Sequence, residues 1–201
     1  MDIFSVALVV AVIVFVLKTR EQRRRIALLA THLGQFQIEK LMETLAEGYL
    51  RALGEKEALR RNQVWAQLDS SEERLVGQFS RFAMGFAKVD EADTRVSTLP
   101  IAVPYADRLL PSLTFDLRKA LQIHAEGFAN TAANTGQLSP RDKAFRMSAE
   151  LFLMQHTCHW YCRSKAVASA RLIVRHQTPY EQVLASVSPE TRAAYGKLIA
   201  G

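Results

Sequence analysis

The sequence is poor in cysteine: its 201 residues contain only Cys158 and Cys162. Two cysteines four positions apart do not make the disulfide framework that holds small secreted domains together. A chain of this length buries enough apolar surface to fold without such cross-links. The cysteine content therefore fits a reducing compartment and does not require an oxidising one.

Motifs that carry catalysis are also missing. The chain contains no phosphate-binding glycine-rich loop, no Gly-x-Ser-x-Gly nucleophile motif and no His-Glu-x-x-His zinc motif. His32, His124 and His176 stand isolated in the sequence, and an isolated histidine is more often structural than a catalytic base. We therefore expect a protein that is not an enzyme.

Patterns typical of β-strands are missing as well. No segment alternates apolar and polar residues over the length of a strand between glycine or asparagine turns. Instead, apolar residues recur at steps of three and four, for example along 38–53 and 75–86. No repeat of fixed period is evident. The pattern predicts an all-α fold, with a multi-helix bundle after residue 25.

One long hydrophobic run stands at the N-terminus, from Ile3 to Leu17, with fifteen residues and no charge. As a helix it is roughly 22 Å long, which is shorter than the ~30 Å hydrocarbon core of a bilayer. The side chain of Lys18 can reach the interface, and the bilayer can thin locally. A cleaved secretory signal would need a basic segment before the run and a small-x-small cleavage site after it. Neither is present, so we predict a single transmembrane signal-anchor helix at 1–17 rather than a signal peptide or a buried helix.

Positive charge is concentrated directly after this run. Residues 1–25 contain five basic and two acidic residues, a net charge of +3, which is half of the +6 of the whole chain. Basic residues beside a spanning helix stay on the cytoplasmic side. We therefore predict that the chain spans the cell membrane (the inner membrane of a bacterium), with the N-terminus on the outside and the bulk of the chain in the cytoplasm. The basic collar, residues 18–25, contains Lys18, Arg20, Arg23, Arg24 and Arg25.

The basic collar also allows binding to anionic lipid headgroups, which attract each nearby lysine or arginine by about 1 kcal/mol. The simpler interpretation is that the collar only sets the orientation. In the rest of the chain acidic and basic residues are interspersed, without the basic stripe that is typical of nucleic-acid binding. We expect a membrane and another protein as partners, and no nucleic acid.

Two helical segments, 26–88 and 105–201, are predicted around a proline-containing segment at 89–104 that lacks a helical period. This segment is either a linker between two helical parts or a loop on the surface. In the first segment, Ser70 and Glu73 have capping-box spacing and predict that a helix begins there.

In the second helical segment, a helix is expected to resume at Tyr105, with a restart or kink at Pro111. The longest helix is predicted at 140–176. Three hydroxyl residues precede a proline and predict helix N-caps, because proline suits the first position of a helix. They are Ser139, Thr178 and Ser188.

The stretch HTCHWYC, residues 156–162, falls within this predicted helix. Cys158 and Cys162 lie one helical turn apart, and His159 lies about 60° from Cys162 around the axis. These three residues are the candidate metal ligands, with zinc or haem as the alternative cofactor. A closed zinc site needs four ligands, and the missing one would have to come from elsewhere, such as His124 or His176. Packing of the two cysteines in the helix core, or thiol redox sensing, explains the same residues.

The sequence favours a membrane-anchored helical module that binds another protein or itself, as an accessory or assembly subunit of a larger membrane complex without a cofactor. The alternative is a metal- or haem-binding sensor or redox protein that uses Cys158, His159 and Cys162.

Overall fold

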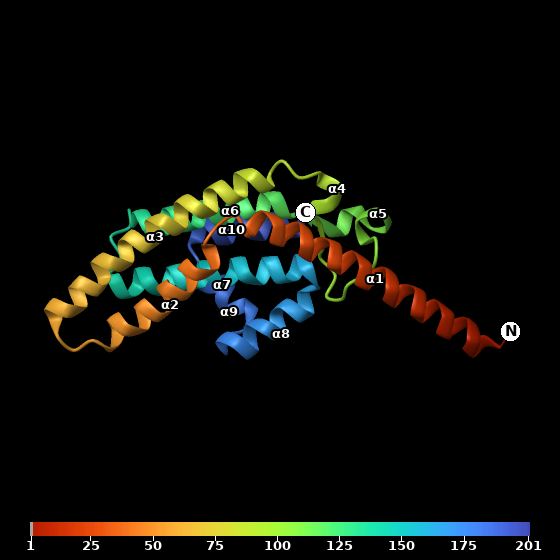
Figure 1. Cartoon of the computed structure of the whole chain (residues 1–201), viewed down its shortest axis with the longest axis horizontal. Helices are drawn as coiled ribbons and strands as arrows, with labels where there is room; N and C mark the ends of the chain where they lie inside the picture. Colours follow the sequence, from red (N-terminus) through yellow and green to blue (C-terminus); the bar gives the residue numbers. More distant parts are fainter. Residues whose placement is uncertain (1) are drawn as a thin grey trace.

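The structure is a computed structural model that describes residues 2–201, and nearly all of its regular structure is helical (Figure 1). The predicted all-α fold is confirmed. Ten α-helices occur among the described residues: α1 (Ile3–Leu33), α2 (Ile38–Gly54), α3 (Ala58–Phe86), α4 (Glu91–Thr94), α5 (Ala106–Leu109), α6 (Leu117–Ala133), α7 (Pro140–Cys162), α8 (Lys165–His176), α9 (Tyr180–Ser186) and α10 (Pro189–Ala200). A 3₁₀ turn, η1 (Pro111–Leu113), and the strands β1 (Arg95–Ser97) and β2 (Thr114–Asp116) complete the chain.

Helix α1 is continuous over 31 residues, but its two halves have different surroundings. Residues 3–16 are exposed, whereas Leu29 near the other end is buried. Figure 1 shows the N-terminal half projecting away from the bundle, with the other half lying along it. By length and composition α1 is long and apolar enough to cross a membrane, and none of its most apolar 18-residue stretch is buried.

One hydrophobic core is shared by the helices on both sides of residues 89–104. The apolar face of α2 that the sequence pattern predicted is buried, apart from Leu53, which is exposed. Three phenylalanines of α3 are buried together, and the ring of Phe79 lies 4.8 Å from that of Phe128 in α6. Because α7 contacts α1, α2, α6, α8 and α9, it is the central helix of the bundle.

Helix α3 contradicts the predicted helix start at Ser70, because it runs without a break from Ala58 to Phe86. The buried residues Leu68, Glu72 and Leu75 are spaced by one turn, so the apolar face passes through this region. The Glu72 carboxylate lies 2.7 Å from Nζ of Lys143 and accepts a 2.5 Å hydrogen bond from the Tyr49 hydroxyl. These tertiary partners favour a continuous helix over the local capping signal.

The predicted helix at 140–176 is also wrong in its extent, since it is two helices. Arg163 leaves the helical conformation, and the Ser164 hydroxyl accepts a hydrogen bond from the Val167 N–H as the N-cap of α8. The N–H of Ala166 donates to the carbonyl of Pro100 at 3.0 Å. A serine cap and a contact from a distant loop therefore turn the chain at the end of HTCHWYC.

Two of the three predicted Ser/Thr-Pro caps are confirmed. Ser139 and Ser188 accept hydrogen bonds from the backbone N–H three residues later. At the third, Pro179 is the N-cap and no side chain caps α9, because the Thr178 hydroxyl instead donates to the carbonyl of His176. The side chains of Ser139 and Ser188 thus mark the starts of α7 and α10.

The helix expected to resume at Tyr105 is interrupted until Leu117. Between them lie α5, η1 and the short antiparallel pair of β1 and β2, in which Val96 faces Phe115 and both are buried. The two strands have three residues each, which is too short for an alternating pattern to be recognised in the sequence. Asp116 ends β2 and caps α6 by accepting from the Arg118 N–H.

Candidate functional site

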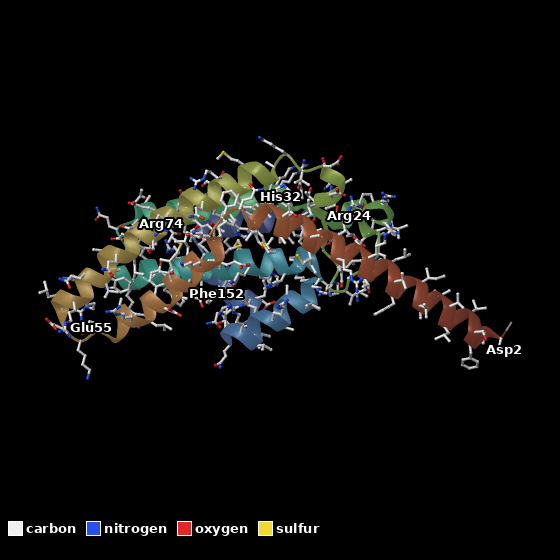
Figure 2. All side chains as sticks on the ribbon, in the orientation of Figure 1. Asp2, Arg24, His32, Glu55, Arg74 and Phe152 are labelled. Carbon is white, nitrogen blue, oxygen red and sulfur yellow. The ribbon has the colours of Figure 1, made fainter. Side chains whose placement is uncertain are left out.

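The basic collar lies where α1 leaves the bundle, and we call this region the α1 junction. It combines collar residues of α1, the loop segment 98–113 and the C-terminal end of α7. Figure 2 shows Arg24 at this point of α1, far from Asp2 at the tip of the helix. The junction is therefore where the projecting helix is attached to the folded part of the chain.

The Arg25 side chain points toward the bundle and is 18% exposed. Its guanidinium lies 2.6 Å from the Glu21 carboxylate and donates to the carbonyl of Tyr161 at 3.2 Å. It also lies 5.3 Å from the centre of the Tyr161 ring, within the range of a cation–π contact. Arg25 therefore holds α1 against the end of α7.

Two more polar contacts support this attachment. Arg24 forms an ion pair with Asp93 of α4, and the Arg163 guanidinium donates to the side-chain oxygen of Gln22 at 2.8 Å. The Tyr161 hydroxyl donates to the carbonyl of Asp93 at 2.8 Å, and burial raises the pKa of Tyr161, which keeps this donor protonated. The contacts join α1, α4 and α7 into one unit.

The five residues of the basic collar therefore divide into groups with different surroundings. Arg24 and Arg25 pair with acidic side chains of the protein, although Arg24 is itself exposed. Arg20 and Arg23 are exposed and have no such ion pair among the described residues. Lys18 is half-buried and lines a small cavity between α1 and segment 98–113. Since Arg20 and Arg23 are three residues apart on a helix, they share one face. This division by contact was not visible in the sequence, where the five charges looked equivalent.

The candidate metal ligands lie in the last turns of α7 and point to different neighbours. The Cys158 sulfur is 3.7 Å from the sulfur of Met154, whereas His159 lines a groove against α8. His124 is buried and paired with the Thr157 hydroxyl at 3.0 Å, so it does not complete a ligand set. Across residues 2–201 the structure groups no three histidine, cysteine or acidic side chains around a common metal position. The metal or haem alternative stays a prediction.

The environment of the two thiols also bears on their chemistry. Burial raises the pKa of Cys158 far above that of a free thiol, and it raises the pKa of Cys162 to about 11. The thiolate is the form that binds metals and attacks electrophiles. In this structure both cysteines therefore have the properties of packed, protonated thiols.

Sequence reasoning missed the outer face of α8. This helix carries Arg171 and Arg175, has no acidic residue and leaves Val174 84% exposed. Together with His159 and His176, the two arginines and Val174 line a groove between α7 and α8. In Figure 1, α8 lies at the edge of the bundle. The sequence did contain a sign of this face, because α8 has apolar residues at more positions around its axis than one buried face requires.

The chain matches no known family model, no curated protein and no solved structure.

Proposed function

We propose that the chain is a single-pass membrane protein that α1 anchors to the cell membrane, with the helical bundle on the cytoplasmic side. The observation that carries this proposal is the exposure of residues 3–16, a charge-free helical stretch that extends beyond the bundle. In water this apolar surface would be costly to leave uncovered, and a bilayer provides the matching environment. The bases of the collar then favour the cytoplasmic side for residues 18–201.

The proposed role of the bundle is to bind another protein subunit, as an accessory or assembly component of a membrane complex, rather than to catalyse a reaction. The outer face of α8 is the proposed binding surface. Val174 is 84% exposed, and Val167, which is seven residues earlier on the same face of α8, is also exposed, with Arg171 and Arg175 beside them. An exposed apolar strip flanked by basic residues is complementary to an amphipathic helix with acidic flanks.

The anchor is tested by flotation and by topology. We expect the full chain to float with membranes and to resist alkaline extraction. A reporter fused after Gly201 should be active only in the cytoplasm. A soluble chain would overturn the anchor, and a reporter active outside the cytoplasm would overturn the orientation.

The protein partner is tested by placing a photoreactive amino acid at position 174 in cells. We expect one discrete cross-linked product, whose mass distinguishes a different subunit from a second copy of the chain. Leu50, exposed on α2, is the matched control position and should give none. The cross-linked product should also disappear when Arg171→Glu is added. If the chain with the photoreactive residue at position 174 and Arg171 intact gives no product, α8 is not the binding surface.

A further inference from the structure

Segment 98–113 exposes several apolar side chains that do not belong to the hydrophobic core of the bundle. Ile101 is 65% exposed and Leu109 is 68% exposed. The others are Tyr105, Leu110 and Leu113. Exposed apolar side chains gathered in one segment commonly mark a surface that contacts a membrane or another molecule.

The position of this segment indicates which of these it contacts. The backbone N–H of Tyr105 donates to the Glu21 carboxylate of α1 at 3.2 Å, and Ile101 lines one cavity with Lys18. Glu21 is four residues beyond Leu17, which is about 6 Å along the helix axis. The headgroup layer on each side of the hydrocarbon core is roughly 5 to 8 Å thick. If α1 spans the membrane, segment 98–113 therefore lies at the level of the headgroups, as its place beside α1 in Figure 1 illustrates.

The charges around the segment suit the same surface. Arg108 is exposed within the segment, and Arg20 and Arg23 are exposed on the far side of α1 at the same level along its axis. The acidic residues beside the segment are Glu21, Asp90, Asp93 and the half-buried Asp107. The Arg108 guanidinium lies 5.6 Å from the ring centre of Tyr105. Arginine attracts anionic headgroups, and tyrosine is favoured at the membrane interface.

We propose that segment 98–113 is a second membrane contact, which inserts Ile101 and Leu109 into the interface of an anionic bilayer beside α1. This inference rests on the proposed anchor. Insertion draws the end of the bundle onto the bilayer and holds Lys18 at the interface. A spanning run of only roughly 22 Å is then supported by a second apolar element at its cytoplasmic end.

The test uses the full chain in vesicles that contain anionic phospholipid, with either ordinary or brominated acyl chains. The variant Ile101→Trp adds a fluorescent reporter to the segment. Leu50→Trp is the matched control. Leu50 lies near Glu55, and Figure 2 shows Glu55 at the opposite end of the molecule from Asp2. We expect bromine to quench the tryptophan at position 101 about twofold, as for a side chain at the acyl boundary, and to leave the one at position 50 unchanged. The unsubstituted chain provides the background of Trp65 and Trp160.

The outcomes separate this inference from the anchor. If the unsubstituted chain does not float with the vesicles, the proposed anchor fails. If it floats but the tryptophan at position 101 is quenched no more than the one at position 50, only the insertion fails, and a protein partner becomes the better explanation for the segment.

A second comparison distinguishes insertion from mere closeness to the membrane. Leu113→Trp reports on the segment, and Leu109→Asp in the same chain should abolish its quenching while flotation persists. Quenching that survives Leu109→Asp would overturn the proposal. Vesicles without anionic lipid should give weaker quenching, and equal quenching would overturn the part assigned to the arginines.

Discussion

The N-terminal half of α1 and the whole of α7 are both long helices, but they meet opposite surroundings. Only Leu29 is buried among the 31 residues of α1, whereas eleven of the 23 residues of α7 are buried. Residues 3–17 are nevertheless the more apolar stretch, because α7 contains many charged and polar side chains. Burial inside this protein therefore does not follow hydrophobicity. The most apolar helix surface is exposed, as the proposed membrane anchor requires, and α7 is buried because five helices surround it.

The buried polar groups of α7 show what this position requires. Glu150 is fully buried and accepts a hydrogen bond from the Ser188 N–H at 3.0 Å. Thr157 is buried between His124 and the Tyr195 hydroxyl, at 3.0 and 2.8 Å. Burial of an unpaired polar group would destabilise the fold by several kcal/mol. Glu150 and Thr157 instead each have a hydrogen-bond partner distant in sequence, although the second carboxylate oxygen of Glu150, Oε2, has none.

The largest effect is expected from charge in the exposed half of α1. Val9→Arg with Val12→Arg places two arginines in the apolar run, each of which disfavours membrane insertion by about 2.5–3.5 kcal/mol at the helix centre. The chain should move from the membrane fraction to the soluble or aggregated fraction. Val174→Arg, at an exposed position outside α1, is the control and should stay with the membrane. Equal membrane recovery of both variants would contradict the role of α1.

In α7 the opposite change should destabilise the fold, namely the loss of the positive charge that pairs with a buried carboxylate. Lys143 lies 2.7 Å from the buried Glu72 carboxylate, so Lys143→Met leaves that carboxylate unpaired. We expect the free energy of unfolding to fall by about 3–5 kcal/mol, as for other buried pairs with one partner removed. Denaturant unfolding in detergent measures it, with exposed Lys119→Met as the control. Adding Glu72→Gln should recover part of the loss, and no recovery would argue against the ion pair as the cause.

The thiols at the end of α7 should react slowly. At neutral pH the rate of alkylation follows the thiolate fraction, so a pKa of about 11 instead of 9 predicts a roughly 100-fold slower reaction of Cys162 than of a free thiol. Cys158 should be slower still, because burial raises its pKa further. Mass spectrometry of the folded and the unfolded chain after iodoacetamide provides the comparison. Metal content measured on the same anaerobic sample tests the alternative role, and one metal per chain that is lost in Cys158→Ala would favour it.

The bundle should lose stability in mild acid. Burial lowers the pKa of His124 to about 3 and that of His156 to about 4, so the folded state excludes protons that the unfolded state binds below its ordinary pKa near 6.5. Their contribution to stability is complete above pH 6.5 and decreases as the pH falls toward the folded pKa values. The expected loss is about 1.4 kcal/mol per histidine for each pH unit.

Urea unfolding of the full chain in neutral detergent between pH 7.5 and 5 measures this slope. His124→Gln should flatten it, although the variant starts from a lower stability. Glu150 acts in the opposite direction, because burial raises its pKa and so favours the folded state at low pH. A stability that rises as the pH falls from 6.5 to 5 would contradict the histidine assignment.

The smallest change in stability is expected at the α1 junction. There it distinguishes Arg24 and Arg25 from Arg20 and Arg23. Arg25→Ala removes an ion pair and a cation–π contact, and should lower the free energy of unfolding by about 1–2 kcal/mol. Arg23 is exposed, so Arg23→Ala should leave the free energy of unfolding unchanged while weakening binding to anionic vesicles. Thermal unfolding of both variants in neutral detergent makes the comparison. Equal destabilisation would show that the collar does not divide as its contacts indicate.

Local pattern alone was sufficient for several features of this protein. The three- and four-residue spacing of apolar side chains predicted the all-α fold and the buried face of α2. Ser139-Pro140 and Ser188-Pro189 predicted the starts of α7 and α10, since an N-cap needs only its own first turn. The apolar run from Ile3 and the basic collar were visible for the same reason, because composition along a single helix decides both.

Tertiary structure decided what depends on contacts between distant residues. The tertiary partners of Glu72 override the capping signal at Ser70. Helix α7 ends at Cys162 because Ser164 caps the next helix, in which the Ala166 N–H donates to the carbonyl of Pro100, 66 residues earlier in the chain. The same holds for much of the collar, because Asp93 distinguishes Arg24 and Tyr161 distinguishes Arg25, whereas the pair of Arg25 with Glu21 lies within one turn of α1. Periodicity and composition act within one helix, so they determine that helix and its apolar face. Which charge is paired, which thiol is packed and which loop lies beside α1 is decided only when the helices pack together.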